Sequence, residues 1–514
     1  MQGNNNDNMD KLIPARDSRR SWLMFAALLA LYLATHFVLR LLFPQTLELD
    51  EAEQMVLAQQ LALGYSVQPP LYTWLQWGMF QMFGPSVLSL ALLKYSLLAV
   101  TFGMLYLIAR KMLPTAGLCA LAVFSLLLIP SFAWESLRDL THSVLVTAIA
   151  VSALYSIVRL GERGRQWDYV MLGVLLGLGV LSKYSFAIAA AAMLLAVLGL
   201  PAYRQRILHK RFGLTLLAGF VVVLPHLIWM FMHREPLMAF IVHETGNGAV
   251  EGYWNGVMTG LGSLAGNMAS FLTPLWLVFA IVFGGIWRQP RAAGVEITEP
   301  RRFVGRFLIV VLLLLAVAIL GGVTRFQERW FQPLLVVLPL AMFGWVSRYD
   351  VPVRQLRRYA WTLVGFAALV VVGRVGQIGV LPWFDDYTRL HLPSKALAAQ
   401  LRAAGFEGGV IVADSYLTGG NLRLFFPDSR VVVPGRGLVS GPDGGAAGPC
   451  LVVWDASDNK AMSARLAAYL RESAGAGEGR TLAGQQVKAL LTLAGDRWHT
   501  LAYLVLEPGG AGCV

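Results

Sequence analysis

The sequence predicts an all-α polytopic membrane domain with about 11 transmembrane helices, followed by a small α/β domain outside the membrane. Of its 514 residues, 56% are hydrophobic and 14% are charged, and the mean hydropathy is +0.59. Soluble domains carry roughly 25% charged residues. The apolar residues gather in runs of about 20, the length of a helix that crosses a bilayer. Backbone polar groups in lipid must be satisfied within each segment, so these runs predict helices.

Eleven apolar runs are predicted to cross the membrane. They fall within residues 22–376, which form the predicted membrane domain, and they follow a polar and basic tail at 1–21 that we expect in the cytoplasm. The runs are 22–43, 87–108, 115–133, 141–158, 168–182, 184–202, 212–232, 264–287, 307–322, 331–347 and 359–376.

The Lys and Arg residues between these runs predict the orientation of the chain. One side holds 22 of them, whereas the other side holds five, namely Arg138, Lys183, Arg234, Arg325 and Arg329. Because cytoplasmic loops are rich in Lys and Arg, the N-terminus is expected in the cytoplasm. The segment after the first run, the loop 233–262 and the C-terminal region are then expected on the extracytoplasmic side. The same distribution argues that a pI near 9.7 reflects membrane topology and not a nucleic-acid partner.

Residues 380–514 change in character and predict a separate α/β domain. Short apolar runs at 410–413, 430–433, 451–454 and 501–506 are typical of strands, and the patterns at 394–404 and 461–473 are typical of helices. The glycine-rich stretch 435–448 predicts a mobile loop. It lacks the strand-linked glycine pattern of a phosphate-binding turn, so no nucleotide site is predicted.

An acidic segment follows the first predicted helix. Residues 47–71 contain Glu48, Asp50, Glu51 and Glu53 and no Lys or Arg. A carboxylate at the membrane surface can accept a proton from an alcohol or amine, or orient it. Asp50, with Glu53 three residues later, also fits an N-cap and its capping-box partner. The two roles are compatible.

This segment resembles the bacterial members of glycosyltransferase family 39, which have the GT-C fold. The resemblance rests on Asp50-Glu51 and on the sequence PPLYTWL at 69–75. It extends over roughly residues 20–350 through four further elements, at 137–139 (Leu-Arg-Asp), 181–184 (Leu-Ser-Lys-Tyr), 225–229 (Pro-His-Leu-Ile-Trp) and 328–333 (Glu-Arg-Trp-Phe-Gln-Pro). The chain departs from many relatives after Asp50-Glu51, where it has no tyrosine, and at Gln68, where they have Lys or His.

The resemblance implies an inverting transfer of a sugar from a polyprenyl-phosphate donor to an envelope acceptor on the outer side of the cytoplasmic membrane. The acceptor could be lipid A or lipopolysaccharide, another glycan or a protein. The leaving phosphate needs cations and hydrogen-bond donors rather than a general acid. The catalytic candidates are Asp50, Asp139 and, with less weight, Glu51; the candidates for contacts with the donor phosphate or substrate are Lys183, Arg329, Arg138, Gln68 and Tyr72.

Structural interpretations compete at several of these positions. Lys183 could snorkel to the surface, and Arg329 could be an ordinary loop cation. Lys94 lies within an apolar run and receives no role, while His226 is expected to be a packed helix residue. A metal site is not predicted, because candidate ligands such as His233, His243 and Glu244 lack helical spacing. A requirement for a divalent ion stays an open question.

Two other classes of function remain open on the sequence. A transporter or flippase for lipid-linked sugars would also have many helices, but the sequence shows no internal repeat and its polar residues gather in outward loops. A catalytically inactive scaffold of envelope assembly is the third possibility.

Overall fold

A computed structural model describes residues 19–65, 68–234, 242, 245–246, 250–292, 294, 296–435, 448–457, 461–474, 484–493 and 496–506. The chain divides into two compact units. The first, here called the helical unit, comprises Met1–Thr35, Val67–Leu71 and Lys94–Val370. The second, the sheet unit, comprises His36–Ser66, Tyr72–Leu93 and Val371–Val514, so it includes the acidic segment as well as the C-terminal region.

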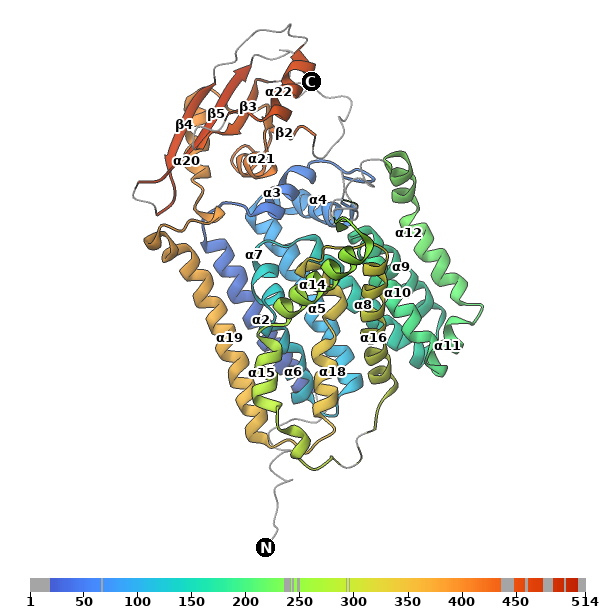
Figure 1. The fold of residues 1–514 in the computed structure, drawn as a ribbon. Coiled ribbons are helices and arrows are strands. Elements are labelled where there is room, and N and C mark those ends of the chain that lie inside the picture. Colours follow the sequence, from blue (N-terminus) through green and yellow to red (C-terminus); the bar gives the residue numbers. More distant parts are fainter. Residues whose placement is uncertain are drawn as a thin grey trace. The chain divides into compact units, whose positions relative to one another are not determined.

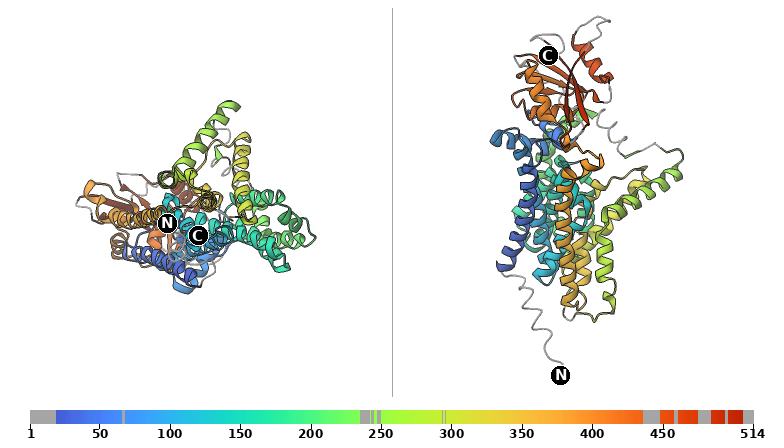
Figure 2. Two further views of the ribbon diagram at one scale, coloured as in Figure 1. Left: turned by 90° about the horizontal axis from the view of Figure 1, so that it is seen from below. Right: turned by 90° about the vertical axis from the view of Figure 1, so that its left-hand side faces the viewer.

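The described residues contain six helices long and apolar enough to span a membrane, namely α2 (Arg19–Leu42), α5 (Val87–Met112), α8 (His142–Arg163), α12 (Phe212–Met232), α16 (Glu299–Leu320) and α19 (Val353–Gly379). Four bent helix pairs and the shorter apolar helix α9 (Gln166–Ser182) account for the other predicted runs. The prediction of a polytopic helical membrane domain is therefore confirmed, and the chain is a multi-pass membrane protein. Figures 1 and 2 show the helices of the helical unit side by side.

The bent pairs are a feature that the apolar runs did not reveal. The bends are 81° between Ala116–Leu128 and Ser131–Arg138, 116° between α10 (Phe186–Leu198) and α11 (Pro201–Ile207), 64° between Tyr253–Leu272 and Leu275–Arg288, and 52° between α17 (Glu328–Leu335) and α18 (Leu338–Val346). A proline stands at the start of each second helix: Pro130, Pro201, Pro274 and Pro339. Proline ends a preceding helix but fits the first turn of the next one, so it produces these breaks. The runs stay apolar across the breaks, so hydropathy alone does not reveal them.

Helices α9 and α12 pack backbone against backbone at the glycines of α9. A Cβ atom added to Gly173 would lie 2.2 Å from the backbone oxygen of Thr215. The Thr215 hydroxyl also donates a hydrogen bond to the backbone oxygen of Tyr169, at 2.9 Å. Small residues at such a crossing let two membrane helices approach closely.

The sheet unit contains a five-stranded sheet of order β2-β1-β3-β5-β4. Strands β1 (Val410–Ala413), β2 (Arg430–Val432) and β3 (Cys450–Asp455) are parallel, whereas β5 (Trp498–Leu506) runs antiparallel to β3 and to β4 (Gln485–Leu490). The predicted small α/β domain is thus confirmed, and all four predicted strands are present. The predicted loop at 435–448 lies, apart from its ends, outside the described residues.

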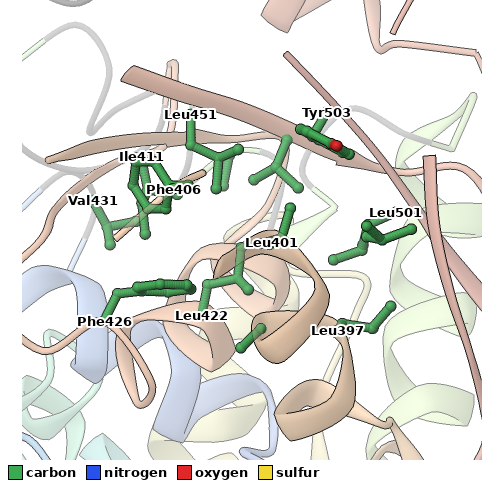
Figure 3. Close-up of a cluster of buried hydrophobic side chains, with 14 of the residues drawn as sticks. Leu397, Leu401, Phe406, Ile411, Leu422, Phe426, Val431, Leu451, Leu501 and Tyr503 are labelled. Atoms are coloured by element: carbon green, nitrogen blue, oxygen red, sulfur yellow. The ribbon is translucent and has the colours of Figure 1, made fainter. Parts of the chain in front are cut away.

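Helices cover both faces of this sheet (Figure 1). Alternate residues of a strand point to opposite faces. Ile411 of β1 and Leu451 of β3 pack with α20 (Ser394–Ala403) and α21 (Tyr416–Arg423), as Figure 3 shows for the buried side chains. On the other face, Val412 and Val452 pack with α22 (Ala464–Ala474).

Strand β4 and helix α21 of the C-terminal region were not predicted. Strand β4 has the sequence QQVKAL and buries only alternate side chains, so its apolar signal is short. Helix α21 contains Gly419 and Gly420, which lower helix propensity. Packing requires one of these glycines, since a Cβ atom on Gly420 would lie 2.5 Å from the backbone oxygen of Ala52.

Candidate active site

The acidic segment forms helix α3 (Leu49–Leu57), and its N-cap is Glu48. The backbone N–H of Glu48 donates to Glu51 Oε2 at 3.3 Å, which places Glu51 as the capping-box partner. The expected N-cap role of Asp50 is therefore wrong by two residues. Glu48 and Glu51 have the same three-residue spacing as Asp50 and Glu53, so both pairs fit a capping box, and the helix begins at the first of them.

Two acids of the segment form ion pairs. Glu51 Oε2 lies 2.8 Å from a terminal nitrogen of Arg40, and both side chains are almost fully buried. The Arg40 guanidinium also donates to the backbone oxygen of Thr46 at 2.9 Å. Glu48 pairs with Arg389 at 3.2 Å. These contacts join the end of α2, the start of α3 and the C-terminal region within the sheet unit, and they hold the Glu51 carboxylate in a buried ion pair.

Asp50 differs from Glu51 in exposure. It lies in the first turn of α3 and is half-buried, whereas Glu51 is 1% exposed. Nearby Tyr72, at the start of α4 (Leu71–Phe83), is completely buried. Burial, followed by the charges of Glu51 and Asp50, raises the pKa of Tyr72 well above its ordinary value. Tyr72 therefore stays protonated at neutral pH. Of the carboxylates of Asp50 and Glu51, that of Asp50 is the more accessible.

The second half of α3 and the residues just after it are bonded to neighbouring segments. Gln54 accepts a hydrogen bond from the Thr73 hydroxyl of α4 at 2.9 Å. The Gln59 side chain makes two backbone hydrogen bonds with Val431 of β2, at 2.9 and 2.8 Å. Arg423 of α21 donates to the backbone oxygen of Met55, and burial lowers the pKa of this arginine to about 10. Asp50 thus lies on a helix that is held by side-chain contacts rather than on a loop.

The second group of predicted residues surrounds the turn that precedes α8 in the helical unit. The turn follows a π-helical segment, η2 (Ser131–Glu135), and the short helix α7 (Ser136–Arg138). Asp139 is 9% exposed. The Lys94 ammonium of α5 donates to the backbone oxygen of Arg138 at 2.9 Å and reaches that of Asp139 at 3.4 Å. A buried lysine therefore lies at the predicted catalytic aspartate.

Lys183 lies between α9 and α10, next to the start of α8. It is the C-cap of α9, and its ammonium donates to the Ser143 hydroxyl of α8 at 2.8 Å. His142 lies next to Ser143, and its Nδ1 is 3.3 Å from the backbone oxygen of Ser182. Arg138 forms an ion pair with Glu135 at 3.1 Å. Asp139, Arg138 and Lys183 thus belong to directly connected elements around the start of α8.

Arg329 lies in the first turn of α17 and is exposed, and its Nε donates to Gln327 at 2.6 Å. On the same helix, the Gln332 amide donates to the backbone and hydroxyl oxygens of Ser131 and to the Ser136 hydroxyl, at 2.8 to 2.9 Å. Helix α17 is therefore bonded to the segment that leads to Asp139.

Gln68 belongs to the helical unit and is half-buried.

Three residues around these sites were missed or unassigned on the sequence: Lys94, Gln332 and Arg40. The signal for Lys94 was its place in an apolar run, since a charge at membrane depth is costly and marks functional sites. The buried polar contacts of Gln332 have no such signal. His226 agrees with its prediction as a packed helix residue, because it is 1% exposed and bonds Tyr184 Oη at 3.1 Å.

The described residues contain no group of three or more His, Cys, Asp or Glu that could hold a metal ion. His243 and Glu244, two of the weak metal candidates, lie outside the described residues.

Comparison with known proteins identifies the family. The profile described as dolichyl-phosphate-mannose-protein mannosyltransferase matches residues 67–229. The lipopolysaccharide core galacturonosyltransferase RgtB of Rhizobium johnstonii is 34% identical over 439 residues, which cover 84% of this chain and 87% of RgtB. The chain belongs to glycosyltransferase family 39. RgtA of the same organism, also a lipopolysaccharide core galacturonosyltransferase, is 30% identical over 83% of this chain and 85% of RgtA.

Solved structures support the fold of this family 39 protein. The structure of ArnT from Cupriavidus metallidurans bound to undecaprenyl phosphate superimposes with a TM-score of 0.57, over 94% of this chain and 98% of ArnT, at 14% identity. ArnT in the apo state gives a TM-score of 0.53 at 16% identity, over 94% and 97%. The protein is a membrane glycosyltransferase of the GT-C fold.

Proposed function

We propose that this family 39 enzyme transfers galacturonic acid from a polyprenyl-phosphate carrier to the core of lipopolysaccharide on the outer side of the cytoplasmic membrane. The observation that carries the proposal is the likeness to two lipopolysaccharide core galacturonosyltransferases along 84% and 83% of the chain. The distribution of Lys and Arg supports a cytoplasmic N-terminus and an extracytoplasmic C-terminal domain. A membrane-soluble donor suits that side, where no nucleotide sugar is supplied.

The cationic group around the start of α8 is proposed to bind the donor. Cleavage of the anomeric bond leaves a phosphate anion, whose growing charge needs fixed positive groups. Lys183, Arg138 and the buried Lys94 lie on elements that contact this turn, and α17 carries Arg329. The N-terminus of α8, a helix of 22 residues, adds the positive end of its dipole. Asp139 is proposed to orient these cations. Gln68 and Tyr72 remain proposed substrate contacts.

Asp50 is proposed to act on the acceptor. Its half-exposed carboxylate can accept the proton of the attacking hydroxyl as the oxygen adds to the anomeric carbon. The bond from that carbon to the phosphate oxygen breaks in the same step, so the configuration inverts. Glu51, which is held by Arg40, is proposed to fix the helix that carries Asp50 and not to touch the substrate.

The test is transfer by the purified protein with polyprenyl-phosphate galacturonate and isolated lipopolysaccharide core. We expect the core to gain the mass of one uronic acid residue, that is, the acid less one water, and free polyprenyl phosphate to appear in equal amount. Mass spectrometry of envelope lipids and glycans from cells with and without the protein should show the same difference. Transfer of a different sugar, or loss of sugar from a protein in the deletion strain, would contradict the proposed substrates. Absence of released polyprenyl phosphate would favour a flippase or a scaffold.

A further inference from the structure

The sheet unit contains a pocket of about 260 Å³ that the proposed transfer chemistry does not use. Its apolar wall consists of leucines from α20, α21 and β5 and from the segment before α20. Its polar wall includes Asp414, Ser415, Thr418, Asn421, Asp455 and His499. Pockets for drug-sized ligands measure about 300–1,000 Å³, so this volume suits a smaller group such as one sugar ring.

The pocket lies where the topology of an α/β sheet favours a ligand. Asp414 directly follows β1, and Asp455 is the last residue of the parallel neighbour β3. The chain continues from β1 into α21 on one face of the sheet and from β3 towards α22 on the other face. In open α/β sheets, ligands bind at the carboxyl ends of the strands where the connections diverge in this way.

One oxygen of Asp414 is available for a ligand. Its Oδ2 accepts a hydrogen bond from the backbone N–H of Asp455 at 3.0 Å, which fixes the carboxylate. Its Oδ1 is buried, and no hydrogen-bond donor approaches it among the described residues. Buried carboxylate oxygens normally have a donor, so this position favours a ligand that brings an O–H or N–H group.

The charges of the pocket select the type of ligand. Two carboxylates line it, and among the described lining residues the one basic side chain is His499. A phosphate or a uronic acid would meet like charge there, whereas a hydroxyl or an ammonium group would find acceptors. Ser457 Oγ and Asp455 Oδ1 both approach the same ring nitrogen of His499, Nδ1, at 2.9 and 4.0 Å. A hydrolytic triad needs its two partners on opposite ring nitrogens, so this group is not a hydrolase site.

Helix α21 connects the pocket to the segment that carries Asp50. Leu417 and Thr418 line the pocket, while Gly420 and Arg423 of the same helix contact Ala52 and Met55 of α3. Asn421 lines the pocket and accepts a hydrogen bond from the Leu47 backbone N–H at 2.9 Å, two residues before α3 begins.

We propose that this pocket binds one neutral or amine-bearing sugar ring of the acceptor glycan. The assignment of this sugar to the acceptor rests on the proposed function. Helix α21 contacts α3, and α3 carries Asp50, the carboxylate proposed to activate the acceptor. The site would hold a sugar of the acceptor that is not itself modified, and it would exclude the anionic product unit.

The binding test uses the purified full chain and three soluble probes: methyl glucosaminide, methyl glucoside and methyl galacturonide. Saturation-transfer NMR should give the strongest signal for the amine-bearing probe, a weaker one for the neutral probe and none for the uronide. Asp414→Asn should reduce binding of the glucosaminide about tenfold, because a hydrogen bond to a charged group is lost. Asp428→Asn, an exposed aspartate of the same unit, is the matched control and should bind like the parent.

A second variant guards against misfolding. Thr418→Met should fill part of the pocket without touching Asp414 and should weaken binding of the same probe. Equal signals from all three probes, or parental binding by Asp414→Asn or Thr418→Met variants with parental melting temperatures, would overturn the inference.

The transfer assay separates this inference from the proposed function. Asp414→Asn should raise KM for the acceptor about tenfold and leave kcat and KM for the donor unchanged. Asp50→Asn should lose transfer but keep glucosaminide binding. If the pocket binds the probe and yet no sugar is transferred from a polyprenyl phosphate, the proposed function fails and the pocket stands. If transfer occurs and Asp414→Asn leaves KM for the acceptor unchanged, the acceptor assignment fails alone.

Discussion

The start of α3 and the turn before α8 use the same types of charged residues in opposite proportion. At α3, four acids occur within six residues, and two of them, Glu51 and Glu48, pair with Arg40 and Arg389. At the turn before α8, a single aspartate, Asp139, has Arg138 as its neighbour, and the buried Lys94 and the cap residue Lys183 bond to the surrounding segments. One place is rich in acceptors, and the other in donors.

The difference fits the two separate tasks that we propose for these places. A surplus of carboxylates suits a group that must lose a proton, and a surplus of cations suits a group that gains negative charge. The two places also differ in which of their charged residues are buried. At α3 the buried Glu51 has a structural ion pair and the half-buried Asp50 remains accessible, whereas near α8 the buried Lys94 supports a turn whose other cations are more exposed.

Among the variants considered, Asp50→Asn, in the acid-rich segment, should reduce enzyme activity the most. Removal of a general base is expected to reduce kcat by about 100-fold or more, because the amide cannot accept the acceptor proton. Transfer rates at saturating donor and acceptor measure the effect, with Asp428→Asn as the control. Near-parental turnover by the Asp50→Asn protein would assign the base elsewhere.

Glu51→Gln tests the structural role of the neighbouring acid. Loss of one partner leaves Arg40 buried without its counter-charge, so the variant should lose about 3 kcal/mol of stability. Thermal unfolding in detergent measures the loss. The double variant Arg40→Met with Glu51→Leu should lose less, since no uncompensated charge remains. If Glu51→Gln keeps its stability and loses only kcat, Glu51 acts in catalysis.

Lys183→Gln tests the cation-rich side. The variant should raise KM for the donor about 10- to 100-fold, because a charge-assisted contact with phosphate is lost, and it should leave KM for the acceptor unchanged. Lys111→Gln is a matched control, since Lys111 is more exposed and pairs with Glu162. A rise in KM for the acceptor instead would exchange the tasks assigned to the two places.

Tyr72→Phe gives the smallest expected effect and a pH signature. The pKa of Tyr72 is raised in the folded protein, so above about pH 10 the unfolded chain releases a proton that the folded chain retains. Stability therefore falls as pH rises beyond that value. Melting curves from pH 7 to 11 should show a steeper decline for the parent than for the variant, and a constant difference below about pH 9. Parallel curves throughout would contradict the burial of the Tyr72 hydroxyl, which is the main cause of its raised pKa.

Much of the fold could be predicted because its signals are local. The apolar runs correspond to the helices and bent pairs of the helical unit, and the four predicted strands lie within a residue or a few of the observed ones. The bends were missed because a proline at a first turn leaves the hydropathy of a run unchanged. Helix α21 was missed because Gly419 and Gly420 disfavour a helix locally, although close contacts with other segments favour them.

The sequence by itself determined that this protein is a membrane protein with an α/β domain, and its motifs indicated which charged residues to examine. Periodicity, run length and motif order are properties of neighbouring residues, so they can be read without coordinates. Only the tertiary structure decided that Glu51 pairs with Arg40, that Lys94 supports the turn at Asp139, and that Arg423 reaches Met55 across 368 positions. Such contacts depend on how distant segments pack, and a single sequence carries no local signal for them.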